Sequence, residues 1–145
     1  MLTLFSIGVL GSFQFVQAQF RKLPAEVTEA FKDKYPETKN VEWKDKIGSF
    51  LVSFEMENVK YEAKFSSKGE WLQTEKQLEP EELPSEVKDG YEKSKFSNWE
   101  LKYLAEIENK EGNLQYRLQV KKNNLEKKNL FFDKEGRLIK DSISL

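Results

Sequence analysis

The sequence predicts an α+β fold made of two tandem repeats, each one helix followed by a four-stranded antiparallel meander, with both helices on one face of the sheet. Three observations lead to this prediction. A short stretch, Leu-Pro-x-Glu-Val, begins at Leu23 and again at Leu83. Each copy is followed by apolar residues at helical spacing, and then by short segments in which apolar and polar residues alternate. Turns that contain glycine separate these segments, as in antiparallel hairpins.

Both predicted helices begin at a proline, which suits the first turn of a helix because the N–H that proline lacks has no partner there. After Pro24, Val27 and Phe31 recur at helical spacing and form an apolar face, and Pro36 ends the helix. The second helix repeats this pattern after Pro84 and fades out near residue 96. Each helix is only about three turns long, so we expect it to depend on packing against a sheet.

The turns set the predicted strand registers. We interpret Glu57 and Asn58 as a two-residue turn and Gly69 as the left-handed residue of the next hairpin. Loops of four residues that end in Gly48 and in Gly112 are predicted for the first hairpin of each repeat. The Glu57-Asn58 turn and the Gly69 hairpin pair apolar residues across the strands, namely Phe54 with Tyr61, Val52 with Ala63, Phe50 with Phe65, and Phe65 with Trp71. They also place Glu55 opposite Lys60 on the other face, a favourable pair.

The predicted organisation is a signal peptide at residues 1–18, a first repeat at 19–80 and a second repeat at 81–145, with one continuous domain over 19–145 as the alternative. Residues 1–18 carry no charge, and the sequence Val-Gln-Ala at positions 16–18 fits the small-residue pattern before a cleavage site. The apolar run is too short and too interrupted for a transmembrane helix. We therefore expect a periplasmic or secreted protein with no membrane anchor after cleavage.

The composition argues against several classes of function. Lys and Arg number 24 against 25 Asp and Glu, and this balance is not typical of a nucleic-acid-binding protein. The chain has no Cys and no His, which removes thiol nucleophiles, imidazole bases and nearly all zinc sites. Its carboxylates project among lysines, and nothing predicts an apolar pocket that would raise the pKa of one of them. We expect no enzymatic activity, no cofactor and no metal.

This arrangement resembles the PepSY-like family of exported bacterial proteins, whose fold is like that of the β-lactamase inhibitor protein. The resemblance rests on the signal peptide, the two Leu-Pro-x-Glu-Val helix starts, Trp43 in the strand after the first helix, and two matching hairpins around Gly69 and Gly136. It implies a small exported protein of a type found mostly in Bacteroidetes-like bacteria. It also implies a binding or inhibitory module, because the inhibitor protein grips its enzyme with the sheet face that points away from its helices.

The face of the sheet opposite the helices is the candidate binding surface. The predicted registers give one cross-strand row in each repeat: Glu42, Leu51, Lys64 and Leu72 in the first, and Leu104, Arg117, Phe131 and Ile139 in the second. A basic residue among apolar ones in both rows suits a protein-binding surface. The alternative is that these are ordinary strand residues, half covered by their neighbours or by the other repeat.

Two further groups are weaker candidates. Four lysines at positions 121, 122, 127 and 128 bracket one turn and could contact an acidic surface, although such a turn is ordinarily just solvated. Trp43, Trp71 and Trp99 could stack on sugars, but strand alternation places them on the face that the helices cover.

The function that these observations favour is that of an exported, non-enzymatic module that binds an envelope or extracellular protein through the open sheet face, in the manner of an inhibitor. One alternative is a cleft between the repeats that binds a peptide or glycan. The other is an envelope component that associates with itself through sheet edges.

Overall fold

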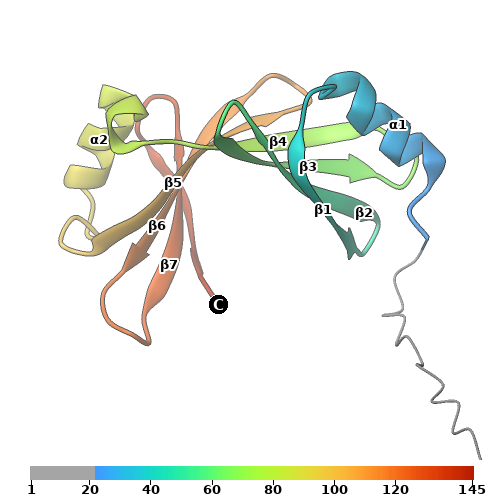
Figure 1. Ribbon diagram of the computed structural model, residues 1–145. Coiled ribbons are helices and arrows are strands. Elements are labelled where there is room, and N and C mark those ends of the chain that lie inside the picture. The colour runs from blue at the N-terminus through green and yellow to red at the C-terminus, as the bar shows by residue number, and fades with distance from the viewer. Residues whose placement is uncertain (1–21) are drawn as a thin grey trace, which may run out of the picture.

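The computed structural model describes residues 22–145, which form two α-helices and one eight-stranded antiparallel sheet (Figure 1). The helices are α1 (Ala25–Lys34) and α2 (Ser85–Glu92), and a short 3-10 helix, η1 (Pro80–Glu82), precedes α2. The strands are β1 (Lys39–Lys46), β2 (Ser49–Met56), β3 (Val59–Ser66), β4 (Trp71–Gln77), β5 (Glu100–Asn109), β6 (Leu114–Lys121), β7 (Lys127–Asp133) and β8 (Leu138–Ile143). The expected signal peptide at residues 1–18 lies outside the described residues.

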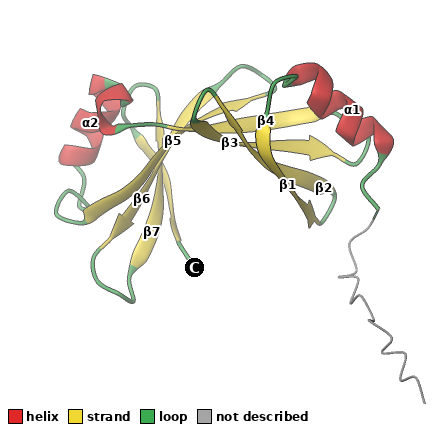
Figure 2. Cartoon of the chain, in the orientation of Figure 1, coloured by secondary structure: helices red, strands yellow, loops and turns green. Residues whose placement is uncertain are grey.

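The strands follow one another across the sheet from β1 to β8, so the sheet is continuous through the β4–β5 pair. Both helices lie on the same side of it, α1 over the first four strands and α2 over the last four (Figure 2). This arrangement follows from the alternation in the central strands of each half, because every second side chain of β2, β3 and β6 is apolar and must be covered.

The first core lies between α1 and strands β1–β4. Phe31 of α1 packs edge-on against Phe54, with ring centroids 5.1 Å apart, and against Trp43 at 5.3 Å. Val27, Val52, Ala63 and Phe65 complete the cluster and are fully buried. Aromatic packing on this scale lets a ten-residue helix persist that would be marginal in isolation.

The second core lies between α2 and strands β5–β7. Val87 of α2 is fully buried among Leu118, Val120, Leu130 and Phe132. The Tyr91 hydroxyl donates a hydrogen bond of 2.7 Å to the carbonyl of Trp99, which ties the end of α2 to the segment that enters β5. Each half of the sheet therefore has its own helix and its own apolar cluster.

Most of the predicted registers in the first half are confirmed. Phe54 lies opposite Tyr61, Val52 opposite Ala63, Phe50 opposite Phe65, Glu55 opposite Lys60, and Phe65 opposite Trp71. Glu57 and Asn58 both have positive φ, as the predicted two-residue hairpin turn requires.

The predicted pairing of the first hairpin is wrong in each half. Only Ile47 and Gly48 lie between β1 and β2, so the pairing moves by two residues and Lys44, rather than Glu42, lies opposite Leu51. Residues 110–113 lie between β5 and β6, and Glu108 pairs with Leu114 rather than with Asn113, so the pairing moves by one residue. A shift of one residue exchanges the two faces of a strand.

The one-residue shift in β5 is confined to the part of the strand after Lys102. A β-bulge there separates the Leu101–Val120 pair from the Tyr103–Gln119 pair. The predicted row of Leu104 with Arg117 implies that Tyr103, Ala105 and Ile107 face the helix, but after the bulge they lie on the other face. Leu101, before the bulge, faces α2.

Twist gives the sheet the form of a saddle. Successive strands rotate by about 20 to 25° in the same sense, so over eight strands two diagonally opposite corners bend toward the helices and the other two bend away from them. The β1–β2 hairpin forms one of the corners that bend away, and the β6–β7 hairpin with the end of β8 forms the other (Figure 1).

Candidate functional site on the open face of the sheet

We call the face of the sheet opposite α1 and α2 the open face. It is made of the strand residues that alternate with the core residues, and its middle lies over β4–β6, where the two halves join. Neither helix covers it among residues 22–145. The side chains on this face are therefore available to a partner unless they cover one another.

Four polar side chains meet at the middle of the open face: Glu75 of β4, Tyr103 of β5, Arg117 of β6 and Asn129 of β7. We call them the central cluster. Arg117 donates two hydrogen bonds to the Glu75 carboxylate, one from Nε to Oε2 at 3.1 Å and a shorter one from Nη2 to Oε1. Its Nη1 donates a third to Asn129 Oδ1 at 2.9 Å. This geometry holds the guanidinium in one orientation.

Tyr103 contacts both members of the Arg117–Glu75 ion pair. Its hydroxyl donates to Glu75 Oε1 at 3.2 Å, and its ring lies 4.8 Å from the Arg117 guanidinium carbon. The Glu75 and Arg117 side chains are only 12% and 21% exposed, and Ala105, opposite Arg117, is fully buried. The cluster thus covers Ala105 with charged and aromatic side chains that are held in fixed positions.

The electrostatics of the cluster favour the ion pair. Burial, assisted by the charge of Glu75, raises the pKa of Tyr103 to about 12, so its hydroxyl stays protonated and can donate. Burial alone would lower the pKa of Arg117, but the hydrogen bonds and attraction to Glu75 outweigh it and raise that pKa. Glu62 of β3 lies beside the cluster and accepts a hydrogen bond from Ser53 Oγ at 3.4 Å.

The structure brings together only part of each predicted row. Leu51 and Lys64 lie opposite each other on the open face, as do Arg117 and Phe131. Lys140 follows Phe131 in that second row, and its ammonium lies 5.7 Å from the centroid of the Phe131 ring. Phe131 is therefore an aromatic residue next to the central cluster, half-buried by its neighbours.

The other four residues that were predicted for these rows do not lie in them. Leu104 is 4% exposed and belongs to the second core, because the shift in β5 turns it toward α2. Leu72 and Ile139 are the extra residues of equivalent bulges, since Lys64 pairs with Gln73 and Phe131 with Lys140. Glu42 lies opposite Ser53, one pair away from the expected row.

Sequence reasoning missed three members of the central cluster: Glu75, Tyr103 and Asn129. Tyr103 lies in a run in which every second residue from Leu101 to Ile107 is apolar. The one departure from alternation is Leu104, which the bulge at Lys102 turns toward the core. Glu75 and Asn129 are ordinary polar residues in strands. The signal that could have found them is the pairing of β4 with β5, since it brings Glu75 within reach of Arg117.

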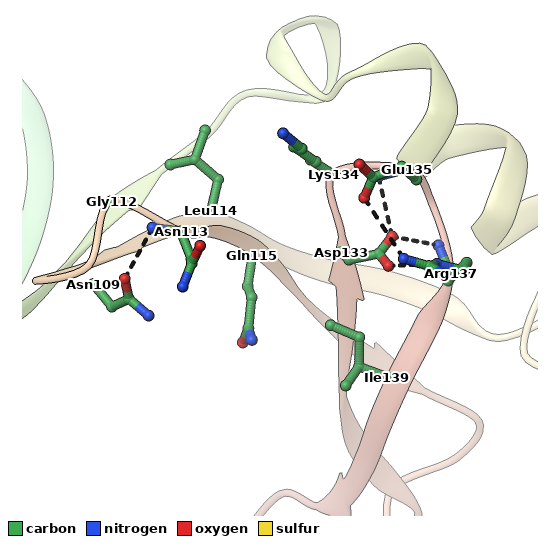
Figure 3. A pocket seen from close by; sticks show the side chains of 10 residues that line it. All are labelled: Asn109, Gly112, Asn113, Leu114, Gln115, Asp133, Lys134, Glu135, Arg137 and Ile139. Atoms are coloured by element: carbon green, nitrogen blue, oxygen red, sulfur yellow. Dashed lines mark hydrogen bonds and ion pairs between the residues drawn. The ribbon is translucent and has the colours of Figure 1, made fainter.

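A cavity of about 340 Å³ lies near the ends of the β5–β6 and β7–β8 hairpins (Figure 3). It lies wholly in the second half of the chain and is lined by polar side chains, including Asn113, Gln115 and Arg137, with Ile139 as an apolar wall. Gln115 and Ile139 point to the same side of the sheet in Figure 3. The hollow can therefore offer amide groups beside an apolar surface.

Two further properties concern residues 22–145 as a whole. Neither helix in this range has the length and apolar character needed to cross a membrane. The same range contains no group of three acidic side chains placed to hold a metal ion.

The family described as "Putative beta-lactamase-inhibitor-like, PepSY-like" matches residues 48–140. The match begins just before β2 and ends within β8, so it includes the whole open face from β2 to β7. No curated protein matches the sequence.

Several solved structures share the fold. A DUF2874 family protein from Bacteroides uniformis superposes with a TM-score of 0.77 at 20% identity, covering 83% of this chain and 88% of that one. A "putative periplasmic" protein from Bacteroides eggerthii gives 0.77 at 21% identity, with coverage of 83% and 88%. A BLIP-like protein from Bacteroides fragilis gives 0.73 at 21% identity, with coverage of 86% and 89%.

Proposed function

Because this chain belongs to the PepSY-like family, we propose that it is an exported, non-enzymatic module that binds a protein partner on the open face, in the manner of an inhibitor. The family match and the BLIP-like neighbour support a binding module with this fold. Export is supported by the uncharged, apolar residues 1–18 and by the neighbour described as periplasmic.

The observation that carries the proposal is the central cluster with Phe131 beside it. Arginine and the aromatic residues are the types that dominate protein–protein binding energy, provided that they are held rigidly and exclude water. Here three hydrogen bonds orient Arg117, the Tyr103 ring covers it, and Phe131 lies directly opposite it in the next strand. A partner would therefore meet a preorganised surface and lose little side-chain entropy on binding.

The surrounding face supports the same function. Leu51, between Lys44 and Lys64, forms a second, smaller contact area in the first half. A partner that spans β2 to β7 would touch both areas, and such a span is of the size that specific interfaces need.

The test is capture of the partner from an envelope extract with an affinity-tagged chain. Phe131→Asp and Leu51→Asp each place a charge on the open face, and we expect each to abolish capture while leaving the circular dichroism spectrum unchanged. Lys32→Glu, an exposed change on α1, is the matched control and should leave capture intact. Capture that survives both open-face variants would place the binding surface elsewhere.

We also propose that the two halves are tandem repeats, each a helix followed by a four-stranded meander. Supporting this, Gly69 and Gly136 occupy the same position in matching hairpins, with φ of +83° and +84°. Each of them lies against the carbonyl of the Glu in its own Leu-Pro-x-Glu-Val stretch, Glu26 or Glu86.

The 340 Å³ cavity favours a second candidate, the binding of a peptide or glycan. The side-chain amides of Asn113 and Gln115 line it, and such groups suit hydroxyl and peptide ligands. A panel of peptidoglycan fragments and peptides should then raise the melting temperature, and Gln115→Leu should remove the rise. A panel that causes no rise would contradict this candidate.

A further inference from the structure

The two corners of the saddle that bend away from the helices differ from the rest of the surface. The first corner is the two-residue turn at Ile47 and Gly48, between β1 and β2. The second is the β6–β7 turn, residues 122–126, together with the end of β8, since Ile143 pairs with Lys128. Both corners project on the side opposite α1 and α2 (Figure 1).

The most exposed apolar side chains in residues 22–145 lie at these corners. Ile47 is 105% exposed, Leu125 95% and Ile143 75%, and Leu145 follows at the end of the chain at 115%. The other exposed large apolar residues, Val41, Leu138 and Ile139, are between 38% and 53% exposed and lie outside these corners. Single exposed apolar side chains are common on protein surfaces, but here the four most exposed ones gather at the two corners that project to the same side of the sheet.

The turn that carries Leu125 is built to hold it outward. The Asn123 side chain accepts hydrogen bonds from the backbone N–H of Leu125 at 2.8 Å and of Glu126 at 2.9 Å. Its amide also donates to Glu126 Oε2 at 2.9 Å. An Asx turn of this kind orders the loop, so the exposure of Leu125 is a fixed feature of the fold.

Positive charge surrounds both apolar tips. Residues 121–128 carry four lysines and one glutamate, and Lys122 pairs with that glutamate, Glu126, at 3.7 Å. Lys128 pairs with Asp141 at 2.6 Å, whereas Lys121 and Lys127 make no ion pair within residues 22–145. The first corner carries Lys44 and Lys46 with one acid, Asp45. Each corner is therefore positive, although the whole chain has a net charge of −1.

From this geometry we propose that the two corners dock the protein peripherally on an anionic lipid surface. Isolated aliphatic side chains with lysines beside them suit a membrane interface, where each side chain enters the headgroup layer and each lysine is attracted to anionic lipid. A protein surface would instead need a shaped pocket for each tip, at the spacing the saddle imposes. Docking would turn the open face toward the lipid, so a protein bound there would itself lie at the membrane surface.

The chain has no cysteine, which allows a site-specific test. Ile47→Cys, Leu125→Cys and the control Ile139→Cys are each labelled in the full chain with an environment-sensitive fluorophore. Vesicles of phosphatidylglycerol and phosphatidylethanolamine are then added, with phosphatidylcholine vesicles as the neutral comparison. We expect a blue shift at positions 47 and 125 with the anionic vesicles only, no shift at 139, and loss of the shift at about 0.5 M salt, where charges are screened within a few ångströms.

A sedimentation assay with the same vesicles gives the second measurement. Lys121→Gln with Lys127→Gln should weaken partitioning by about tenfold or more, because each lysine near an anionic surface contributes severalfold. The proposal is overturned if the labels at 47 and 125 remain in water on the anionic vesicles, in which case the corners are contacts for an acidic protein. It is also overturned if position 139 shifts equally. Neither result bears on the open-face residues, whose capture assay uses other variants.

Discussion

Gly136 lies directly against the carbonyl of Glu86 in the first turn of α2, so that a Cβ on Gly136 would be 2.0 Å from that oxygen. Its φ of +84° is also one that residues with a side chain rarely adopt. The β7–β8 hairpin can approach the helix this closely only because position 136 has no side chain.

Gly136→Ala should therefore be among the most destabilising small changes in the chain. The left-handed backbone costs about 1 to 2 kcal/mol with a Cβ, and the clash with the helix backbone adds about 1 to 3 kcal/mol. Gly112→Ala is the matched control, since its φ is +80° but nothing lies within 4 Å of its Cβ position. Urea denaturation of the two variants should separate strain from clash, and equal losses in both would contradict the close approach.

The Arg117–Glu75 pair should be coupled in stability. Arg117→Met leaves a carboxylate that is 12% exposed without its partner, which we expect to cost about 1 to 3 kcal/mol. Adding Glu75→Leu should recover much of this loss, because the buried charge is then gone. A double-mutant cycle by urea denaturation measures the coupling. The control, Asp89→Asn, breaks an exposed pair and should leave the stability unchanged within error.

Stability should fall in alkaline solution because two tyrosines resist ionisation in the fold. Burial first, and then the neighbouring glutamate, raises the pKa of Tyr103 and of Tyr116 from 10.0 to about 12. A raised pKa in the folded state contributes stability that is fully present below pH 10 and is lost as pH rises from 10 through 12. Urea denaturation between pH 8 and 12 should show this decline, and Tyr103→Phe should flatten it. A decline of the same slope in the Phe variant would contradict the assignment.

Phe31 should be the main anchor of α1. Its ring contacts those of Tyr35, Trp43, Phe54 and Phe65, with centroid distances between 5.1 and 6.3 Å. Phe31→Ala should cost about 3 to 5 kcal/mol, because the surrounding side chains can collapse only partly into the cavity that the ring leaves. Ile47→Ala, at a fully exposed position, should cost nothing measurable in the same urea titration.

The places where the sequence predicted the fold well are those where turn chemistry and alternation agree. The Glu57-Asn58 turn aligns the residue pairs of β2 and β3 on the correct faces, and a one-residue error would have exposed Phe54 and Val52. Helix starts were equally clear, since Pro24 and Pro84 each precede the first helical residue.

The candidate site was harder to predict because it depends on where a strand changes register. Every second residue from Leu101 to Ile107 is apolar, which favours one face for all of them, and only Leu104 breaks the alternation. The choice is made by tertiary structure: the bulge at Lys102 lets Leu104 fill the second core while Tyr103 reaches Glu75. Contacts between residues that are distant in sequence stabilise this bulge, so the local pattern alone does not reveal it.

The strand order from β1 to β8 has a consequence for how the chain reaches its native state. Every strand pairs only with its neighbours along the sequence, through hairpins of two to five residues and a single longer crossing between β4 and β5. Contact order is therefore low for a sheet protein, and little loop-closure entropy precedes each new ladder. Because each half has its own helix and apolar cluster, folding can nucleate in either one. Pairing of β4 with β5 would then join the second half to the first. We therefore expect the chain to refold faster than a β-sandwich protein of equal length.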